Sequence, residues 1–328
     1  MWATDPGGDI YIRSAETTGM TDTPPTSVLL PTVRWTDACD EVAEQLGPDD
    51  ELLVVADTAG DRVVDRAERD EGLPDGVQVV LAGEPVDCSG KANAIATGME
   101  AAANDRIVWT DDDFHHPPDW LEGLHADYER QGATTERPAF VGRDPLGVLL
   151  EPAYLVGGTI PVAVGGIVWG GAVVFERDDI DEGAFLADLR RALSDDGALT
   201  EHLDVTAADR TRVVPAGGSV RESLERFVRF LWIARYYAPR ATALNVALAA
   251  VLAVACLVAP LPTVGLLTAV SAATYAWAGL HRPTFLLAAP GVLVAPVLLS
   301  YALGRRTFVW AGRRYRWRAM YEVEVRDP

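Results

Sequence analysis

Short apolar segments alternate with segments of helical spacing through the first part of the chain. Apolar residues recur every three to four positions over 37–46, and an alanine-rich stretch over 91–103 also favours a helix. Buried strands are predicted over 27–33, 51–56, 77–82 and 106–110. Because strands that alternate with helices form parallel sheets, the pattern predicts an α/β domain whose ligand lies beyond the carboxyl ends of the strands.

A different pattern begins near residue 241. From Ala241 to Leu303 the only charged residue is Arg282, and prolines divide the block into apolar runs over 241–259, 262–280 and 284–303. As a helix each run is roughly 27–30 Å long, about the thickness of the hydrocarbon core of a bilayer. We therefore predict two to three transmembrane helices over 241–303. Buried core helices of a soluble protein are the alternative.

The segments on either side of this block are basic. Residues 219–240 place Arg226 and Arg229 among aromatic side chains, which predicts an amphipathic helix at the membrane interface. The same guanidinium groups are candidates for binding a diphosphate or a lipid phosphate. Residues 304–328 form an arginine-rich tail, and short basic flanks favour the cytoplasm. Three crossings would place this tail opposite the α/β domain, so the number of crossings and the side of the tail stay open.

Residues 1–25 are polar, and we interpret them as a disordered N-terminal segment. They contain no apolar run of the kind that forms a signal peptide. We therefore expect the α/β domain over 26–218 to stay in the cytoplasm, held at the cell membrane by a multi-pass C-terminal block.

Composition narrows the class of protein. The 328 residues carry a net charge of −20, and Lys91 is the single lysine, a balance that favours a halophilic origin as a hypothesis. No basic stripe covers the acidic first two thirds, which argues against a nucleic-acid partner. Cys39, Cys88 and Cys256 lie far apart, which excludes a disulfide scaffold and a zinc site of the usual spacing.

Two of the predicted strands end in aspartates. Asp57 follows the strand over 51–56, and Asp111, Asp112 and Asp113 follow the strand over 106–110. Carboxylates grouped at one strand end repel each other unless a cation lies between them, and hard oxygen ligands suit Mg²⁺ or Mn²⁺. The alternative is an acidic turn that caps the next helix. The sequence does not specify which two of the three would bind a metal.

Three further segments are candidates for chemistry. Gly90 and Lys91 precede a predicted helix and offer backbone N–H groups and a cation to an anion. The glycine-dense segment over 165–171 favours either close approach of the backbone to a ligand or a hairpin loop. Asp195 and Asp196 follow a serine, so they are either the first turn of a capped helix or a carboxylate pair with one general base.

In this order the segments resemble membrane-bound family 2 glycosyltransferases of the GT-A fold. The resemblance runs from Asp57 to the C-terminus and includes the segments SGKANAIATGMEAA, WTDDDFHHPPDWL, GGIVWGGAVVFERDDI, SDDGALTEHL and RFVRF. The tail sequence WAGRRYR is similar to the WRGRRYR tail of the ceramide-glucosyltransferase-like branch, which the chain resembles most. The chain departs from the family pattern after the first strand, where Thr32-Val33-Arg34-Trp35 stands, and at Phe230, where the family has tryptophan.

The resemblance implies an α/β GT-A domain of the Rossmann-like, nucleotide-sugar-binding kind, followed by an interfacial helix and a C-terminal transmembrane helical block. It implies that Asp196 is the catalytic base. For the donor it implies contacts from Asp57, Lys91, Asp111, Arg226 and Arg229. For the acceptor it implies Gly166, Trp169 and Asp195, and for the metal Asp113 with Asp111.

The activity that this resemblance implies is inverting transfer of a sugar from a nucleotide-sugar, in the first place a UDP-sugar, to a lipid or polyprenyl acceptor. The cofactor implied is Mn²⁺ or Mg²⁺. The alternative is a non-catalytic membrane scaffold or binding protein that retains the glycosyltransferase fold. The sequence specifies neither the sugar, the base and the acceptor nor the oligomeric state.

Overall fold

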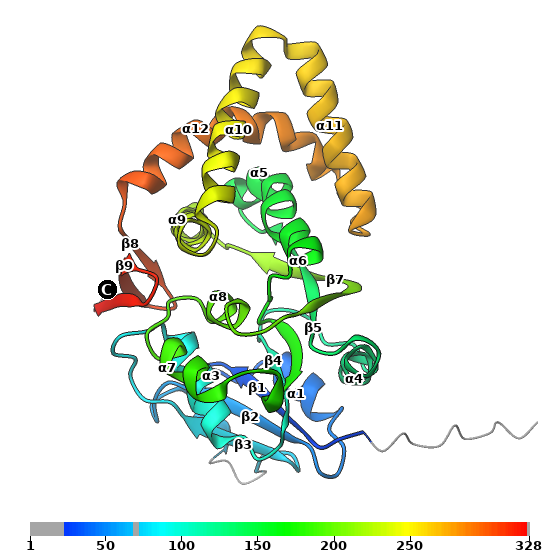
Figure 1. The fold of residues 1–328 in the computed structure, drawn as a ribbon, viewed down its shortest axis with the longest axis vertical. Coiled ribbons are helices and arrows are strands. Elements are labelled where there is room, and N and C mark those ends of the chain that lie inside the picture. The colour runs from blue at the N-terminus through cyan, green and yellow to red at the C-terminus, as the bar shows by residue number, and fades with distance from the viewer. Residues whose placement is uncertain (1–22, 68–71, 327–328) are drawn as a thin grey trace, which may run out of the picture.

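The computed structural model of the protein describes residues 23–67 and 72–326. The segment predicted to be disordered, 1–25, lies outside the described residues except for its last three. The described chain has two sheets, a set of helices around the larger sheet, and a helical projection at one end (Figure 1).

The larger sheet has seven strands in the order β3-β2-β1-β4-β6-β5-β7. The four predicted strands are confirmed as its first half, and each lies within two residues of the predicted bounds. The strands are β1 (Thr26–Pro31), β2 (Glu51–Ala56), β3 (Val77–Leu81), β4 (Arg106–Thr110), β5 (Thr134–Gly142), β6 (Ala172–Glu176) and β7 (Thr206–Ala216).

The four predicted strands are parallel as expected, but the whole sheet is mixed, because β6 is antiparallel to both of its neighbours. The strands β1 to β4 are parallel, and β5 pairs in parallel with β7. The register places Ala172, the first residue of β6, beside Thr110, the last residue of β4. The glycine-dense segment before β6 therefore lies at the carboxyl edge of the sheet. From there β6 runs antiparallel to β4, so no crossover helix is needed between this edge and β6.

Helices cover both faces of this sheet and enclose two hydrophobic cores. One core lies under α3 (Gly90–Ala101), α7 (Glu182–Leu189) and α8 (Asp195–Thr200), and the other under α1 (Asp37–Ala43) and α4 (Trp120–Gln131). A short helix α2 (Arg62–Ala67) follows β2. The helix predicted over 37–46 ends three residues early, at Ala43, and Gly47 and Pro48 follow in the turn into β2.

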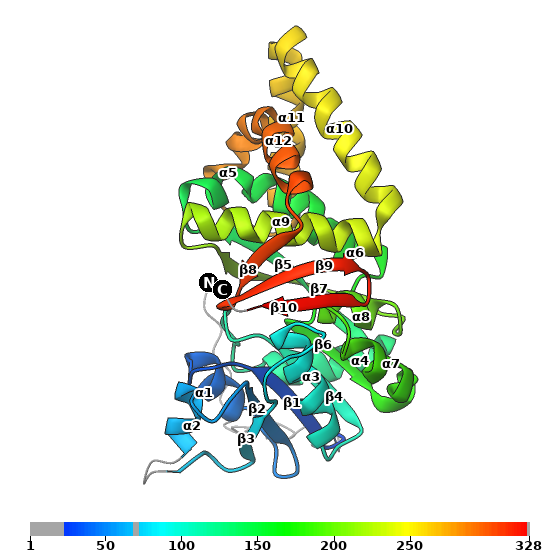
Figure 2. The same ribbon diagram turned by 90° about the vertical axis from the view of Figure 1, so that its left-hand side faces the viewer.

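Two helical segments lie beyond the carboxyl edge of the sheet. One is continuous through α5 (Pro145–Tyr154), a π-helical turn η1 (Leu155–Thr159) and α6 (Ile160–Gly165). The other is α9 (Val220–Tyr237), which corresponds to the predicted amphipathic helix and crosses above the sheet (Figure 2). Its buried residues Val228 and Trp232 are four apart and therefore lie on one face.

The apolar block forms α10 (Pro239–Val258), α11 (Pro260–Trp277), a 3₁₀ turn η3 (Pro283–Leu287) and α12 (Ala288–Gly304). In Figure 1, α10 leads away from the sheet, α11 returns beside it, and α12 lies across their base. Among the described residues, three helical segments are long and apolar enough to cross a membrane: Pro145–Gly165, Pro239–Val258 and Pro283–Gly304. The first of these was not predicted, and α11, which falls on the predicted run 262–280, is not among them.

A buried carboxylate joins the apolar block to the α/β domain. Glu151 in α5 has no exposed surface, and Arg282 donates to both of its oxygens at 2.9 and 3.1 Å. The Tyr275 hydroxyl of α11 donates to it at 3.1 Å, and Thr284 in η3 also donates to it. The single charged residue within the apolar block is therefore an anchor to α5.

The C-terminal tail is a second sheet, which the sequence analysis did not predict. It consists of β8 (Thr307–Trp310), β9 (Arg313–Ala319) and β10 (Glu322–Arg326), all antiparallel. This sheet lies below α9 and beside the carboxyl edge of the larger sheet (Figure 2). The Trp232 indole of α9 donates to the Arg305 carbonyl at 2.7 Å, and the Tyr236 hydroxyl donates to the Arg318 carbonyl at 2.7 Å.

Candidate active site

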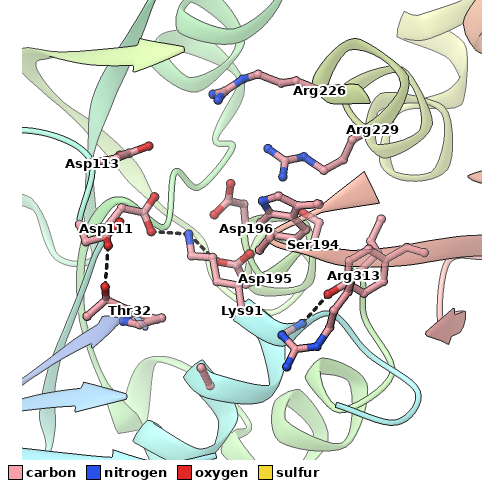
Figure 3. Close-up of a pocket in the computed structure, with 18 of the residues that line it drawn as sticks. Thr32, Lys91, Asp111, Asp113, Ser194, Asp195, Asp196, Arg226, Arg229 and Arg313 are labelled. Atoms are coloured by element: carbon pink, nitrogen blue, oxygen red, sulfur yellow. Dashed lines mark hydrogen bonds and ion pairs between the residues drawn. The ribbon is translucent and has the colours of Figure 1, made fainter. Parts of the chain in front are cut away.

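A pocket of about 310 Å³ lies where the carboxyl edge of the large sheet meets α8, α9 and the C-terminal sheet. In Figure 3, Asp111 and Asp113 lie on one side of the pocket, the two arginines of α9 lie above, Lys91 lies between Asp111 and the α8 aspartates, and Arg313 lies below. Of the residues proposed from the sequence, nine line this pocket: Asp57, Lys91, Asp111, Asp113, Trp169, Asp195, Asp196, Arg226 and Arg229.

Gly166 is the exception, because it does not line the pocket. It ends α6 with a left-handed conformation at φ 63°. A glycine is favoured there for the turn itself, so the structure gives it no contact with a ligand in this pocket.

The aspartates after β4 occupy different environments. Asp112 accepts a hydrogen bond of 2.6 Å from the Thr32 hydroxyl at the end of β1, so it is tied to the neighbouring strand. Burial, and next the charge of Asp111, raise the pKa of Asp113 to about 7. Asp111 and Asp113 are therefore the two carboxylates of this group that are not bound to β1, and Asp113 is short of a compensating cation.

Asp111 and Asp113 fit a divalent cation by their chemistry. Mg²⁺ is commonly bound by one or two carboxylates together with substrate phosphates, and a cluster of three or more protein ligands is not required. Among residues 23–67 and 72–326 no group of three or more histidine, cysteine or acidic side chains is placed to hold a metal. A cation here would depend on a phosphate-bearing ligand for the rest of its coordination.

Lys91 lies between two groups of carboxylates. Its ammonium is 2.6 Å from Asp111 Oδ1 and 3.1 Å from Asp195 Oδ2. Burial alone would lower the pKa of Lys91, but the charges of Asp111 and Asp195 outweigh burial and raise it. The single lysine of the chain is therefore a fixed cation that joins the end of β4 to the start of α8.

The pair Asp195 and Asp196 forms the first turn of α8. The Ser194 hydroxyl accepts a hydrogen bond from Gly197 N at 3.1 Å, so the capped-helix interpretation is confirmed, yet both carboxylates also line the pocket. Gly170 N donates to Asp196 Oδ1 at 2.8 Å, and a Cβ on Gly170 would lie only 2.5 Å from that oxygen. Burial, and next the charge of Asp195, raise the pKa of Asp196 to about 7.

Arg226 and Arg229 are three residues apart on α9, so both point down into the pocket (Figure 3). In the described part of the chain the Nε atoms of both are buried without a hydrogen-bond partner. Burial lowers the pKa of both guanidinium groups, that of Arg229 to about 9. Each guanidinium group lies over an aromatic ring. The guanidinium carbon of Arg226 is 4.7 Å from the ring centroid of Phe140, and that of Arg229 is 4.0 Å from the ring centroid of Trp310.

The pocket lining also includes residues that the sequence did not single out as candidates, among them Thr32, Trp310, Arg313 and Tyr315. Three of them belong to the C-terminal sheet. A signal was present in the apolar and aromatic residues that alternate with arginines over 313–318, around a turn at Ala311 and Gly312 with positive φ of 47° and 76°. The arginine content instead favoured the interpretation of a membrane flank.

Comparison with known families agrees with this geometry. Residues 36–154 match the model described as Glycosyl transferase family 2. The matched segment contains Asp57, Lys91 and Asp111 to Asp113, whereas Asp195, Asp196 and the arginines of α9 lie beyond it. No curated protein matches the chain in sequence.

Solved structures of glucosyl-3-phosphoglycerate synthase from Mycobacterium tuberculosis are similar to parts of the chain. One has 17% identity and a TM-score of 0.40, and the match covers 64% of this chain and 80% of that one. Its complex with uridine diphosphate also has 17% identity and a TM-score of 0.40, with 70% and 86% covered. A third, with Mn²⁺, UDP-glucose and phosphoglyceric acid, has 16% identity and a TM-score of 0.36, with 64% and 79% covered.

At these scores the solved structures carry no argument about the substrate of this chain. The family model does not distinguish between branches of the family. The narrower resemblance to the ceramide-glucosyltransferase-like branch therefore stays a prediction. Residues 36–154 match glycosyl transferase family 2, and this match supports an activity as a glycosyltransferase.

Proposed function

We propose that the chain is a metal-dependent inverting glycosyltransferase that moves a sugar from a nucleoside diphosphate sugar to a membrane-borne acceptor. The observation that carries the proposal is the pair Arg226 and Arg229. Their buried Nε atoms lack partners and face a wall of carboxylates across the pocket. Buried cations without partners are costly, so this pocket is suited to an anion of high charge such as a diphosphate.

In this proposal the donor lies between the arginines of α9 and the carboxylates on the opposite side of the pocket. The guanidinium groups of α9 bind the diphosphate from one side, while Asp57 at the end of β2 faces the nucleoside. Asp111 and Asp113 would hold Mn²⁺ or Mg²⁺ against the diphosphate, and such a cation supplies charge neutralisation of the leaving group. A UDP-sugar is the first candidate, by resemblance to the family.

Asp196 is the proposed general base. Its raised pKa suits a group that takes a proton near neutral pH, and Gly170 N fixes one of its oxygens. The acceptor hydroxyl loses its proton to Asp196 and its oxygen bonds to the anomeric carbon. The bond between that carbon and the phosphate oxygen breaks, and the nucleoside diphosphate leaves with the electron pair. Asp195 and Lys91 hold the turn that carries Asp196 in place.

The acceptor side of the pocket is apolar. Phe140, Phe230, Ile233 and Trp310 line it, and Phe140 and Phe230 continue into a cluster with α12 residues. This apolar wall leads from the carboxylates toward the helical block, which supports a lipid or polyprenyl acceptor. Trp169 lies on the sheet side of the same pocket, beside Phe114.

The C-terminal sheet bears on the membrane topology. Arg313 of this sheet bonds to Asp57 of the α/β domain at 2.5 Å, which supports a topology with the C-terminal sheet and the α/β domain on the same side of the membrane. We propose two crossings, by α10 and by α11, which returns beside it although it is less apolar than the three candidate spans, with α9, α12 and the segment Pro145–Gly165 at the interface. The exposed apolar side chains of α10 and α11 support this arrangement: Leu244, Leu248, Val251, Val254, Leu257, Val258, Leu261, Leu266 and Val270.

The first test is binding of UDP, GDP and CDP to the detergent-solubilised full chain in high salt, with and without Mn²⁺. We expect one nucleotide to raise the melting temperature, and Mn²⁺ to enlarge the shift. Arg226→Ala with Arg229→Ala should abolish the shift. A folded chain that binds none of the three would instead favour the non-catalytic scaffold.

A further inference from the structure

The C-terminal sheet contributes two side chains to the strand end that carries Asp57. Arg313, the first residue of β9, donates from one guanidinium nitrogen to Asp57 Oδ2 at 2.5 Å and from another to Glu84 Oε2 at 2.8 Å. Two residues along the same strand, Tyr315 accepts a hydrogen bond of 3.1 Å from Gly90 N at the start of α3. Because side chains two apart in a strand point to one face, both reach the pocket together.

This contact is closely fitted. Tyr315 is almost completely buried, and Arg313 and Asp57 have side-chain exposures of only 18% and 15%. A Cβ on Gly90 would lie 3.0 Å from the Arg313 guanidinium, so this helix start has no room for a larger residue without a shift. The contact joins residues 256 positions apart in the sequence, across the whole apolar block.

We infer that the C-terminal sheet completes the nucleoside end of the donor site, and that Arg313 is the residue that positions Asp57 for the nucleobase. The inference rests on the proposed function, since it assumes that a nucleotide binds in this pocket. Arg313 takes one oxygen of Asp57 and thereby fixes the carboxylate plane. The second oxygen, Oδ1, can then accept a hydrogen bond from a base that carries a ring N–H.

The chemistry of this contact predicts a choice of base. Uracil and guanine carry a ring N–H at the position where the ring nitrogen of cytosine is an acceptor, so cytosine can offer a carboxylate only its exocyclic amino group. A carboxylate paired with a guanidinium accepts hydrogen bonds and donates none, so its free oxygen binds a ring N–H and repels the lone pair of a ring nitrogen. Arg313 would therefore favour uracil or guanine over cytosine through Asp57.

The test compares Arg313→Ala with Arg318→Ala in the full-length, detergent-solubilised chain. Arg318 lies on the same strand, half exposed, and pairs with Glu324 and Glu322 away from the pocket. Calorimetry would measure binding of UDP, GDP, CDP and inorganic pyrophosphate with Mn²⁺ present. We expect Arg313→Ala to weaken binding of the preferred nucleotide about tenfold, the loss expected for one charge-assisted hydrogen bond. Pyrophosphate binding and the Arg318→Ala variant should stay within about twofold of the parent.

A double-mutant cycle separates positioning from a merely structural effect. If Arg313 acts through Asp57, Arg313→Ala should add no further loss in an Asp57→Asn background, and both should reduce the preference over CDP. Arg313→Lys should restore part of the affinity, and Glu84→Gln should leave it nearly unchanged. Equal nucleotide affinity in Arg313→Ala, additive losses in the cycle, or an equal loss for pyrophosphate would overturn the inference. A parent chain that binds no nucleotide would overturn the proposed function itself.

Discussion

Lys91 Nζ lies 3.1 Å from Asp195 Oδ2, and this ion pair ties the first turn of α3 to the first turn of α8. Lys91 also contacts Asp111 at 2.6 Å. Its ammonium group therefore fixes the distance between Asp111, on the proposed donor side, and the turn of α8 that carries the proposed base Asp196. The single lysine of the chain is thus placed where four carboxylates would otherwise face each other: Asp111, Asp113, Asp195 and Asp196.

Lys91→Met should leave these carboxylates without their internal cation. Removing one partner of a buried ion pair typically costs about 3–5 kcal/mol, so the melting temperature at neutral pH should fall. Mn²⁺ or a lower pH should recover part of this loss, because each neutralises the remaining carboxylates. Thermal unfolding with and without Mn²⁺ measures both effects. Arg62→Met, at an exposed position, is the control, and an unchanged melting temperature in Lys91→Met would contradict the interpretation.

Asp196→Asn should abolish sugar transfer and still bind the nucleotide. The amide retains an oxygen for Gly170 N but cannot take a proton from the acceptor. The folded-state pKa of Asp196 is raised to about 7, so its ionised form opposes folding as the pH rises from about 4 to 7. The variant should therefore melt no lower than the parent at pH 7.5. Transfer at more than about a hundredth of the parent rate would contradict the assignment of the base.

The pH profile of transfer should show an acid limb. Because Asp196 acts as a carboxylate and its pKa is raised to about 7, the fraction of active enzyme should fall about tenfold for each pH unit below that value. The measurement is kcat/KM, which reports the free enzyme, between pH 5.5 and 8.5 with an acceptor that carries a hydroxyl. A profile that stays flat down to pH 5.5 would show that another group accepts the proton.

Glu151→Ala should loosen the apolar block from the α/β domain. The change leaves Arg282 without its carboxylate partner and removes the acceptor of Gly142 N, at 3.0 Å, and of Tyr275. Loss of a buried paired carboxylate costs about 3–5 kcal/mol, whereas Glu151→Gln should cost less because one acceptor oxygen remains. The melting temperatures should therefore rank parent, Gln, then Ala. Glu122→Ala, at an exposed position in the first turn of α4, should leave the melting temperature unchanged.

The two-crossing topology predicts that the turn between α10 and α11 and the C-terminal sheet lie on opposite sides of the membrane. Leu261, at the turn between α10 and α11, is 87% exposed and should lie at the far face of the membrane. In a chain whose native cysteines are replaced by serine, Leu261→Cys should react with an impermeant maleimide added outside intact cells. Arg314→Cys, on the C-terminal sheet, should react only after lysis. The reverse labelling pattern would exclude two crossings with a cytoplasmic α/β domain.

Much of the α/β domain could be predicted because its signals are local. Runs such as ELLVVA over 51–56 and RIVWT over 106–110 are buried on both faces, and aspartates follow each of them directly. A parallel sheet then brings Asp57 and Asp111 to one edge without further information. The antiparallel direction of β6 depends on how the chain returns from α6, which no local pattern specifies.

The tail shows where local reasoning fails. The arginines over 305–318 resemble a membrane flank when only charge is considered. Their position in the fold depends on partners that are distant in the sequence, such as Arg313 with Asp57 and Trp232 with the Arg305 carbonyl. Long-range contacts of this kind leave no periodicity to detect. The same holds for Thr32, whose bond to Asp112 distinguishes one of three adjacent aspartates from the other two.

The C-terminal sheet is synthesised last, after the helices of the apolar block. Arg313 emerges from the ribosome after every apolar helix, and only a chain whose hairpin has returned to its starting side can bring it to Asp57. A truncated chain, or one inserted with an odd number of crossings, lacks this contact. If the C-terminal sheet completes the donor site as proposed, donor binding is conditional on correct membrane insertion, and a misassembled copy does not hold nucleotide-sugar.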